Sequence, residues 1–352
     1  MAKNVNIIHF SANPGGIETM LPWLICSLED YTFEVFVLRP INNNQLNVYE
    51  NSNVIIKYGS FSNIKLIFKL WLYAFKRKDE IFHVYNIGPL YTLILKLSGV
   101  KYLIYSIHGT KYWKTYREKL INKLLWQVAF RKNFFITANS QHSKYIFKHL
   151  INSRRDIKVI YNPIPLDRFN IKENNNSSFV RIIYSGRLVR GKNMFTWLRI
   201  AMHIINEKPD TKCDIYGDGD LKQKLIEYSH SLGISDNVTF HGFRSDIENA
   251  YKSADLLLFL SEYESFGNVV VESILCGTPV IASDIPSMKE IFKDYPDFLV
   301  CTNNKLEENV MNKVRNIAKL KELAVKAAND FKTRFSHKTH QDKIDQIYAK
   351  MK

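Results

Sequence analysis

The stretch DLLLFLSEYESFGNVVVESILCGTPVIAS, residues 255–283, contains a complete strand–helix–strand unit. The apolar runs at 255–260 and 279–282 have the length and composition of buried strands. Residues 269–271 are all valine and favour a strand by propensity. Their place between two buried strands instead predicts a helix that begins near Gly267. A helix between two such strands indicates a parallel sheet covered on both faces, so this stretch predicts an α/β fold.

The same alternation of short apolar strands and longer helical segments runs along the whole chain. The first series of expected strands is 5–10, 33–38, 54–57, 81–84, 102–107, 134–137 and 157–161. The second series is 180–184, 212–216, 237–240, 255–260, 279–282 and 297–301. The longer helical segments are 62–78, 114–132, 193–207, 219–232 and 310–331, and steps of four, three and four at His340, Ile344, Ile347 and Met351 predict one more. The segment Asn162-Pro163-Ile164-Pro165 interrupts the alternation, so we expect two doubly wound α/β domains, 1–165 and 166–330.

Length and composition describe a globular protein. A chain of 352 residues suits two domains, and 46% hydrophobic with 24% charged residues excludes a disordered chain. The four cysteines are scattered without metal-ligand spacing, as reduced thiols of a cytosolic protein are. The apolar stretch after Met1 is too short for a signal peptide, and no run reaches the ~18 apolar residues of a membrane span. We therefore expect a cytoplasmic protein.

The net charge of +15 is concentrated in the first half of the chain. Residues 1–165 hold 22 Lys and Arg against 9 Asp and Glu, whereas the remainder holds 27 against 25. A general bias of composition toward lysine would affect both halves alike. The asymmetry therefore indicates an anionic partner such as phospholipid, lipid pyrophosphate or nucleic acid.

A glycine pair follows the first expected strand, in the segment NPGGIE at 13–18. Gly15 and Gly16 allow the backbone to approach a ligand closely, and they begin a helix whose amides bind anionic oxygens. A tight turn from strand to helix without a ligand has the same pattern, and both interpretations stay open at this point.

Two permanent cations lie in the equivalent place of the second domain, in the segment YSGRLVRGKN at 184–193. Arg187 and Lys192 come just past the end of an expected strand. A diphosphate leaving group needs such cations, because negative charge grows on it as the bond breaks. Solvated surface cations would give the same pattern.

Two carboxylates, Glu264 and Glu272, stand eight residues apart around the turn Gly267-Asn268. If a helix begins near Gly267, Glu264 lies just before its amino end and Glu272 about one turn inside it. Carboxylates placed there accept hydrogen bonds from sugar and ribose hydroxyls. Acids that only cap the helix would occupy the same positions.

Taken in order, these motifs resemble the retaining family 4 glycosyltransferases of GT-B fold, of the type that builds bacterial surface polysaccharides. The matching motifs are Gly15-Gly16-x-Glu18, Gly186-Arg187 with Lys192-Asn193, and Glu264-x7-Glu272 with Ser265-Phe266-Gly267-Asn268. Supporting matches are His108-Gly109, Asn162-Pro163, Phe240-His241-Gly242-Phe243, and Gly277 to Asp284. The resemblance covers roughly residues 5–332. It implies two Rossmann-like domains facing across a cleft, with a terminal helix in 331–352 that crosses back to the first domain.

The resemblance also implies a role for each matched residue. Arg187 and Lys192 would hold the donor diphosphate, Glu264 the hydroxyls of the donor sugar, and Glu272 the ribose. His108 would lie beside the reacting sugar, where a neutral imidazole can hydrogen-bond a hydroxyl. The remaining donor-binding residues would be Gly15, Gly16, Gly267, Asn268 and Val269 through their amides, with Gly242 and Phe243 near the base. Many relatives have His-Asp where this chain has His108-Gly109, so a carboxylate on the acceptor side is missing.

Mechanistically, the resemblance implies front-face transfer, in which a leaving phosphate oxygen takes the acceptor proton and no protein nucleophile acts. Asp218-Gly219-Asp220 looks like the metal-binding Asp-x-Asp motif of other transferases, but it lies in a turn after a strand. With Arg187 and Lys192 neutralising the diphosphate, we expect no metal site and no cofactor.

Two segments of the first domain, 62–78 and 111–132, combine basic and aromatic residues. At about 100° per residue, Lys65, Lys69 and Lys76 fall within one narrow face. Such helices can rest in a membrane interface, although ordinary domain helices with solvated polar faces share this composition. We expect the first domain to dock on the anionic inner leaflet, which makes the enzyme peripheral and lets it reach a lipid-linked saccharide acceptor.

The sequence therefore predicts transfer from a nucleotide-sugar donor to a lipid-linked saccharide in capsule, O-antigen or exopolysaccharide synthesis. Family frequency favours a UDP-sugar over a GDP-sugar. A nucleotide-sugar epimerase of the same fold is an alternative, and a phosphorylase would need a pyridoxal-binding lysine that no motif identifies. A basic nucleic-acid-binding protein is a further alternative, but the chain has no recognition helix, RNA-binding aromatic motif or zinc spacing, so we expect no nucleic-acid partner.

Overall fold

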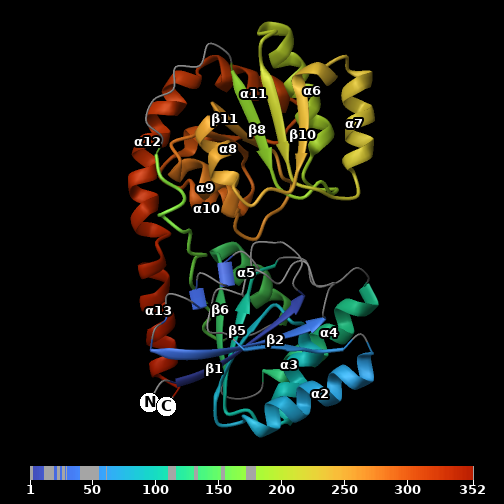
Figure 1. The fold of residues 1–352 in the computed structure, drawn as a ribbon, viewed down its shortest axis with the longest axis vertical. Helices are drawn as coiled ribbons and strands as arrows, with labels where there is room; N and C mark the ends of the chain where they lie inside the picture. The colour runs from blue at the N-terminus through green and yellow to red at the C-terminus, as the bar shows by residue number, and fades with distance from the viewer. Residues whose placement is uncertain are drawn as a thin grey trace. The chain divides into compact units, whose positions relative to one another are not determined.

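The computed structural model describes residues 3–11, 20–21, 24–25, 28, 30–39, 55–60, 62–109, 116–130, 134–151, 155–171 and 180–351. The chain forms two compact units, each built on one parallel sheet (Figure 1). The first unit is Met1–Pro163 together with His337–Lys352, and the second is Ile164–Ser336. No helix in the described ranges is long and apolar enough to cross a membrane.

The first unit has a seven-stranded parallel sheet in the order β3-β2-β1-β4-β5-β6-β7. Its strands are β1 (Lys3–Ser11), β2 (Tyr31–Arg39), β3 (Ile55–Tyr58), β4 (Ile81–Tyr85), β5 (Tyr102–Ile107), β6 (Phe134–Ala138) and β7 (Lys158–Val159). The first strand, β1, lies in the interior of the sheet. Strands β2 and β3 lie on one side of it, and strands β4 to β7 lie on the other side. This order is that of a doubly wound sheet.

Helices cover both faces of this sheet. In the described part of the first unit, the helices with defined bounds are α2 (Asn63–Lys76), α3 (Pro89–Leu97), α4 (Tyr116–Ala129), α5 (Gln141–Ile151) and α13 (His337–Ala349). Alternate strand residues divide between two apolar clusters, because successive side chains of a strand point to opposite faces. Helices α2 to α5 bury Leu66, Leu95, Trp126 and Phe147 on one face. The last helix buries Ile347 and Tyr348 on the other.

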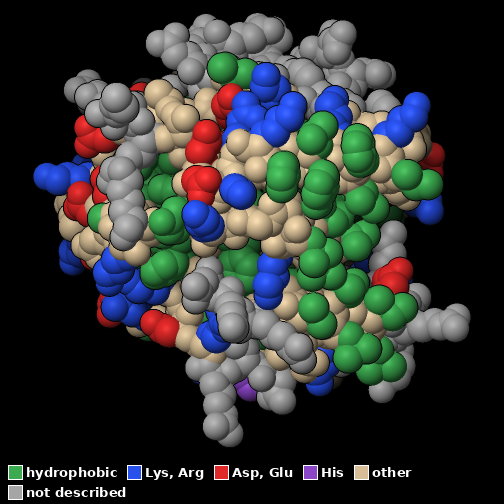
Figure 2. Space-filling view, turned by 90° about the horizontal axis from the view of Figure 1, so that it is seen from below, with side chains coloured by type: hydrophobic (Ala, Val, Ile, Leu, Met, Phe, Trp, Pro, Cys, Tyr) green, Lys and Arg blue, Asp and Glu red, His purple; other side chains and the backbone are tan. Residues whose placement is uncertain are grey.

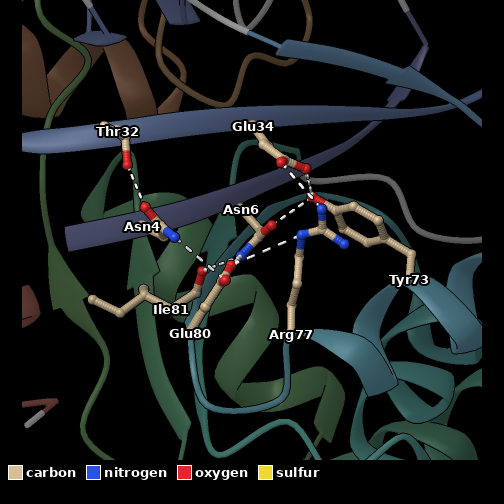
Figure 3. A network of polar contacts seen from close by, with 8 residues as sticks. All are labelled: Asn4, Asn6, Thr32, Glu34, Tyr73, Arg77, Glu80 and Ile81. Carbon is tan, nitrogen blue, oxygen red and sulfur yellow. Dashed lines mark hydrogen bonds and ion pairs between the residues drawn. The ribbon is translucent and has the colours of Figure 1, made fainter. Parts of the chain in front are cut away.

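A polar network holds the carboxyl end of α2 against the amino end of the sheet (Figure 3). The Tyr73 hydroxyl lies 3.0 Å from Glu34 Oε2 and also contacts Asn6 Oδ1. Arg77 pairs with Glu34 at 3.1 Å, and the Asn6 amide donates to Glu80 Oε2 at 2.8 Å. Burial and the nearby Glu34 carboxylate raise the pKa of Tyr73. Since a buried polar group that loses its partner is costly, this network fixes which side of α2 faces the sheet.

The second unit has a six-stranded parallel sheet in the order β10-β9-β8-β11-β12-β13. Its strands are β8 (Arg181–Ser185), β9 (Lys212–Tyr216), β10 (Val238–Gly242), β11 (Leu256–Phe259), β12 (Val280–Ser283) and β13 (Leu299–Val300). Its helices are α6 (Met194–Glu207), α7 (Lys222–Ser231), α8 (Ile247–Ser253), α9 (Asn268–Leu275), α10 (Pro286–Ile291), α11 (Leu306–Arg315) and α12 (Ile317–Arg334). The strand order reverses direction between β8 and β11, which makes this the topological switch point of the sheet.

The predicted α/β class and most predicted elements are confirmed. Strands β5 and β9 have the predicted bounds, and the helix expected near Gly267 is α9, which begins at Asn268. The valine run is helical because its Val270 and Val271 are buried on one side of α9. The spacing predicted for the terminal helix is confirmed by the burial of Ile344, Ile347 and Met351.

The prediction of one helix over 310–331 is wrong, because α11 and α12 meet at Asn316. This residue has φ −102° and ψ 28°, and its side-chain amide donates to the Asn312 carbonyl at 2.9 Å. A side chain that bonds a nearby backbone carbonyl competes with the regular helix there. At the other end of α12, Phe331 is fully buried and its ring contacts Phe335 at a centroid distance of 5.0 Å. Residues 331–334 therefore belong to α12, and the last helix begins at His337.

Candidate active site

The candidate site lies at the carboxyl ends of β8 and β11 in the second unit. Ligands of doubly wound sheets bind outside the carboxyl ends of the strands, at the switch point. Loops 186–193, 217–221, 243–246 and 260–267 follow β8, β9, β10 and β11 at this edge. Two of these loops contain predicted site residues: Arg187 and Lys192 follow β8, and Glu264 follows β11.

Main-chain hydrogen bonds connect the loops after β8, β9 and β11 with one another and with the last residue of β10. The bonds run from Gly217 N to Gly242 O at 2.7 Å, from Leu188 N to Asp218 O at 2.8 Å, and from Glu262 N to Gly191 O at 2.9 Å. Each bond joins segments at the carboxyl ends of two different strands. The site is therefore built on backbone whose polar groups are already paired, which favours a preorganised geometry.

Two glycines allow these loops to approach one another. Gly217 has φ 128°, and a Cβ atom there would lie 1.9 Å from the Gly186 carbonyl oxygen. Gly191 has φ 93°, and its Cβ would lie 2.4 Å from the Tyr263 ring. A side chain at either position would meet both a strained backbone conformation and an occupied space.

Lys192 and Glu264 form an ion pair between the loop after β8 and the loop after β11. Both side chains are largely buried, and the Lys192 ammonium lies 5.8 Å from the centroid of the Phe259 ring. Ser261 Oγ also donates to Glu264 Oε1 at 3.3 Å. The pair brings together two residues that the sequence assigned to the diphosphate and to the donor sugar.

Arg187 lies in the same loop as Lys192, but its side chain is exposed. Its carbonyl accepts a hydrogen bond from the Tyr184 hydroxyl at 3.0 Å, which ties the backbone of Arg187 to β8. Within the described ranges the guanidinium forms no ion pair of 4 Å or less. One cation of the loop is thus held by a carboxylate, and the other is available to an anionic ligand.

Glu272 lies in the second turn of α9, with its carboxyl group withdrawn from solvent although the residue keeps some exposed surface. The Tyr251 hydroxyl donates to Glu272 Oε2 at 3.1 Å. Burial raises the pKa of Glu272 to about 7, against the opposing effects of the Tyr251 hydrogen bond and of Arg168. A hydroxyl of a ligand that donates to this carboxylate would favour its ionised form.

This pKa predicts pH-dependent binding of a nucleotide-sugar. A carboxyl group with a pKa of about 7 when folded and about 4.3 when unfolded binds protons more tightly in the folded state. Its contribution to stability therefore falls as pH rises from about 4 to 7, and donor binding should strengthen as pH rises through about 7. Titration calorimetry of a nucleotide-sugar from pH 5.5 to 8 checks this, with about tenfold tighter binding expected at the upper end.

The matched variant is Glu272→Gln, which keeps the size and the hydrogen-bonding atoms but does not titrate. Its donor affinity should be weaker and independent of pH over this range. An equal pH dependence in Glu272→Gln and the wild type would rule out Glu272 as the titrating group.

The amino end of α9 has no side-chain cap. Gly267 precedes the helix with φ 108°, and a Cβ there would lie 2.6 Å from Met288 Cε. The first N–H groups of a helix have no acceptor within the helix. Asn268 and Val269 are the first two residues of α9, so their amides lie at this end, where an anionic or hydroxyl oxygen is favoured.

The residues predicted to lie near the base, Gly242 and Phe243, lie at the end of β10 and at the start of the loop that follows it. Gly242 has φ 71°. Phe243 follows it and is 60% exposed, a large value for an aromatic side chain of a folded domain. An exposed ring at the edge of a nucleotide site is suited to stacking on a base.

His108 follows β5 in the first unit, whereas the other predicted site residues that the structure describes lie in the second. Burial, with a smaller effect of His340, lowers the pKa of His108 to about 3. Its ring lies 5.3 Å from that of Tyr85. The imidazole is therefore neutral at physiological pH, as its predicted role requires. At the next position, a Cβ on Gly109 would lie 3.0 Å from the Asn86 side-chain amide.

The predicted residues Gly15 and Gly16 lie outside the described residues. Asp218, the first carboxylate of the Asp-x-Asp segment, accepts the Gly219 N–H at 2.8 Å and pairs with Lys222 at 3.2 Å. Across the described part of the chain there is no group of three or more His, Cys, Asp or Glu side chains that could hold a metal ion.

Two residues that shape the site, Tyr251 and Gly217, are not among the predicted site residues. Tyr251 holds Glu272, but it lies on the short helix α8 and belongs to no motif. Gly217 belongs to the segment Tyr216-Gly217-Asp218-Gly219-Asp220, and its pair of glycines after a strand was the available signal. The contact of Tyr251 with Glu272 and that of Gly217 with Gly186 depend on how these segments pack together, which the sequence does not show.

The chain is similar in sequence to known glycosyltransferases. Residues 167–334 match the family described as glycosyl transferases group 1. The chain is similar to an Escherichia coli UDP-Gal:alpha-D-GlcNAc-diphosphoundecaprenol alpha-1,3-galactosyltransferase, with 26% identity over 82% of this chain and 80% of that protein. It is also similar to a Campylobacter jejuni N-acetylgalactosamine-N,N'-diacetylbacillosaminyl-diphospho-undecaprenol 4-alpha-N-acetylgalactosaminyltransferase. That match has 28% identity over 52% of this chain and only 50% of the relative.

Solved structures share the fold over nearly the whole chain. Anabaena HepE, crystallised with UDP and glucose, has a TM-score of 0.84 at 20% identity and covers 99% of this chain and 100% of its own. Sucrose-phosphate synthase from Thermosynechococcus elongatus has a TM-score of 0.79 at 17% identity, with 99% of each chain covered. This similarity confirms the predicted GT-B fold.

Proposed function

We propose that this chain, whose residues 167–334 match the family described as glycosyl transferases group 1, transfers a sugar from a UDP-sugar to a lipid-linked saccharide. The transfer retains the anomeric configuration and needs no metal ion. The observation that carries this proposal is the pairing of Lys192 with Glu264, next to the exposed Arg187, at the switch point.

The three side chains have complementary tasks in this proposal. Negative charge grows on the diphosphate as the sugar leaves, and fixed cations at Arg187 and Lys192 stabilise it where it appears. Glu264 accepts hydrogen bonds from hydroxyls of the donor sugar, and its contact with Lys192 holds sugar and diphosphate sites in register. Glu272 accepts from the ribose, and the ring of Phe243 stacks near the base.

The acceptor is activated without a protein nucleophile. The acceptor hydroxyl attacks from the side on which the diphosphate leaves, and a phosphate oxygen takes its proton. This route retains configuration and uses the two cations in place of a divalent ion. Neutral His108 would hydrogen-bond a hydroxyl of the reacting sugar, and would not add positive charge there.

The substrate classes are supported by the relatives. Two of them are named for acceptors linked to diphosphoundecaprenol, and one of these is also named for a UDP-linked donor. HepE was crystallised with UDP. A lipid-linked acceptor in surface-polysaccharide assembly also suits the basic first half of the chain, whose +13 balance attracts anionic lipid.

Thermal unfolding with a panel of UDP- and GDP-sugars, in EDTA throughout, tests the donor site. A ligand at 100 times its Kd stabilises the folded state by about 2.7 kcal/mol, which raises Tm by a few degrees. We expect a UDP-sugar to stabilise the wild type and not Arg187→Ala. The control is Arg190→Ala, which removes another exposed arginine of the same loop and should behave as the wild type.

Two outcomes would contradict the proposal. Stabilisation that appears only after Mg²⁺ replaces EDTA would overturn metal independence. Conversion of the UDP-sugar into an epimer without any acceptor would identify an epimerase instead of a transferase.

A further inference from the structure

Helix α2 has a buried apolar face, an exposed apolar face and a row of exposed lysines. Leu66, Leu70 and Ala74 are completely buried against the sheet. On the side away from the sheet, Ile64 is 81% and Phe68 is 63% exposed. A helix of a water-soluble domain normally shows polar side chains on its outer face. The outer face of α2 is instead apolar along most of its length.

The apolar face of α2 is ordered by its aromatic side chains. Phe68 and Trp71 stack at a centroid distance of 6.5 Å, and Trp71 and Phe75 at 5.2 Å with 14° between the rings. At ~100° per residue, Ile64 and these three aromatic residues fall within about 60° of one another around the helix. They form one continuous apolar ridge.

Neighbouring helices α3 and α4 extend this surface. Helix α3 packs beside α2, and α4 packs beside α3. Leu97 of α3 is 70% exposed and Leu124 of α4 is 64% exposed. We define the α2–α4 face by the exposed apolar residues Ile64, Phe68, Phe75, Leu90, Leu97, Leu120, Ile121, Leu124 and Val128. Figure 2, seen from below the view of Figure 1, shows hydrophobic side chains gathered on one part of this side, with Lys and Arg beside them.

Charge identifies the occupant of this surface. Lys65, Lys69 and Lys76 are exposed and, at ~100° per residue, fall within about 40° of one another beside the apolar ridge. Helices α2 and α3 contain no acidic residue. An apolar ridge bordered by lysines matches an anionic bilayer, which offers acyl chains below a plane of negative headgroups. A second copy of the chain would bring the same lysines against each other.

The orientation of α2 is also fixed. Tyr73 and Arg77 are held by Asn6 and Glu34 in the network of Figure 3, so the helix cannot turn its apolar ridge inward without losing buried hydrogen bonds. Large contiguous apolar patches on folded proteins mark interaction sites.

We propose that the α2–α4 face inserts into an anionic lipid bilayer, with the three helices in the interface and the lysines at the headgroups. The proposal rests on the proposed function in one respect, since a lipid-linked acceptor gives the docking its purpose. It goes beyond docking by the basic residues alone, because insertion of the apolar side chains supplies most of the binding.

Flotation of the full chain with vesicles made of phosphatidylglycerol and phosphatidylcholine measures its membrane binding and tests this proposal. The variant Ile64→Gln/Phe68→Gln/Leu124→Gln should bind at least about 100-fold more weakly than the wild type, because each side chain loses its transfer out of water. The variant Lys65→Gln/Lys69→Gln/Lys76→Gln should lose the preference for phosphatidylglycerol and the sensitivity to salt. The control is Val325→Gln, which removes an exposed apolar residue of α12 and should bind as the wild type does.

Donor binding separates this proposal from the proposed function. All variants should keep the thermal stabilisation by a UDP-sugar, which also shows that they are folded. Unchanged vesicle binding of the apolar variant overturns the proposal, whether or not donor binding is found. A wild-type dimer that this variant dissociates, together with unchanged vesicle binding, would assign the face to a second copy.

Discussion

A Lys192→Met variant is expected to transfer sugar with a kcat/KM about 1,000-fold below that of the wild type. Removing one preorganised group that stabilises developing charge typically costs 10²–10³-fold. Lys192 has a second task, because its ammonium pairs with the Glu264 carboxylate that is expected to bind the donor sugar. Steady-state assays with saturating acceptor check this, and the loss should appear mainly in kcat, since the charge develops only in the transition state.

The variant Glu264→Gln separates the two tasks of Lys192. If Lys192 only holds Glu264, the Lys192→Met change costs nothing further in the Glu264→Gln background. If Lys192 stabilises the leaving diphosphate, most of the loss remains in that background. Arg190→Met, a change of the same kind in the same loop, should stay within about twofold of the wild type. A loss below about tenfold for Lys192→Met would contradict its assignment to the diphosphate.

A Gly217→Ala variant is expected to destabilise the second unit by at least about 3 kcal/mol and to abolish stabilisation by the donor. The residue has φ 128°, and the new Cβ would lie 1.9 Å from the Gly186 carbonyl oxygen, so the backbone of two loops would have to move. Strain of this type costs about 1–3 kcal/mol before any steric overlap is counted. Urea unfolding monitored by circular dichroism, with and without donor, measures both effects.

Gly233→Ala is the matched control for this change. Gly233 also has a positive φ of 70°, but its Cβ would meet nothing within 4 Å. It should therefore cost only about 1–2 kcal/mol and leave donor binding intact. Equal destabilisation by the two substitutions would show that the close contact with Gly186 contributes nothing.

The sequence predicted the strands and the helix α9 well, because buried strands are apolar runs and each loop follows its strand directly. The position of Glu272 inside α9 followed from the same reasoning. The contact between Lys192 and Glu264 could not be predicted, since it joins loops 72 residues apart whose distance depends on the packing of β8 beside β11. The raised pKa of Glu272 could not be predicted from the sequence either, because it depends on the burial of the carboxyl group and on its hydrogen bond with Tyr251.

The charge pattern predicted a basic surface on α2 but not its apolar ridge. The sequence gives the angular positions of Ile64, Phe68 and Phe75, yet only the packing of α2 shows which side of the helix is buried. The break at Asn316 was missed for a similar reason: an asparagine is tolerated inside many helices, and the local hydrogen bond to Asn312 decides the outcome.

The last helix gives the first unit a discontinuous chain. Tyr348 is completely buried there, and its hydroxyl lies 2.8 Å from His83 Nδ1, so the core around β4 is incomplete without residues that are synthesised after the second unit. The second unit is continuous from Ile164 to Ser336 and can fold as soon as that segment has left the ribosome. The synthesis of the first unit begins before that of the second, yet the first unit is therefore the one that finishes folding last.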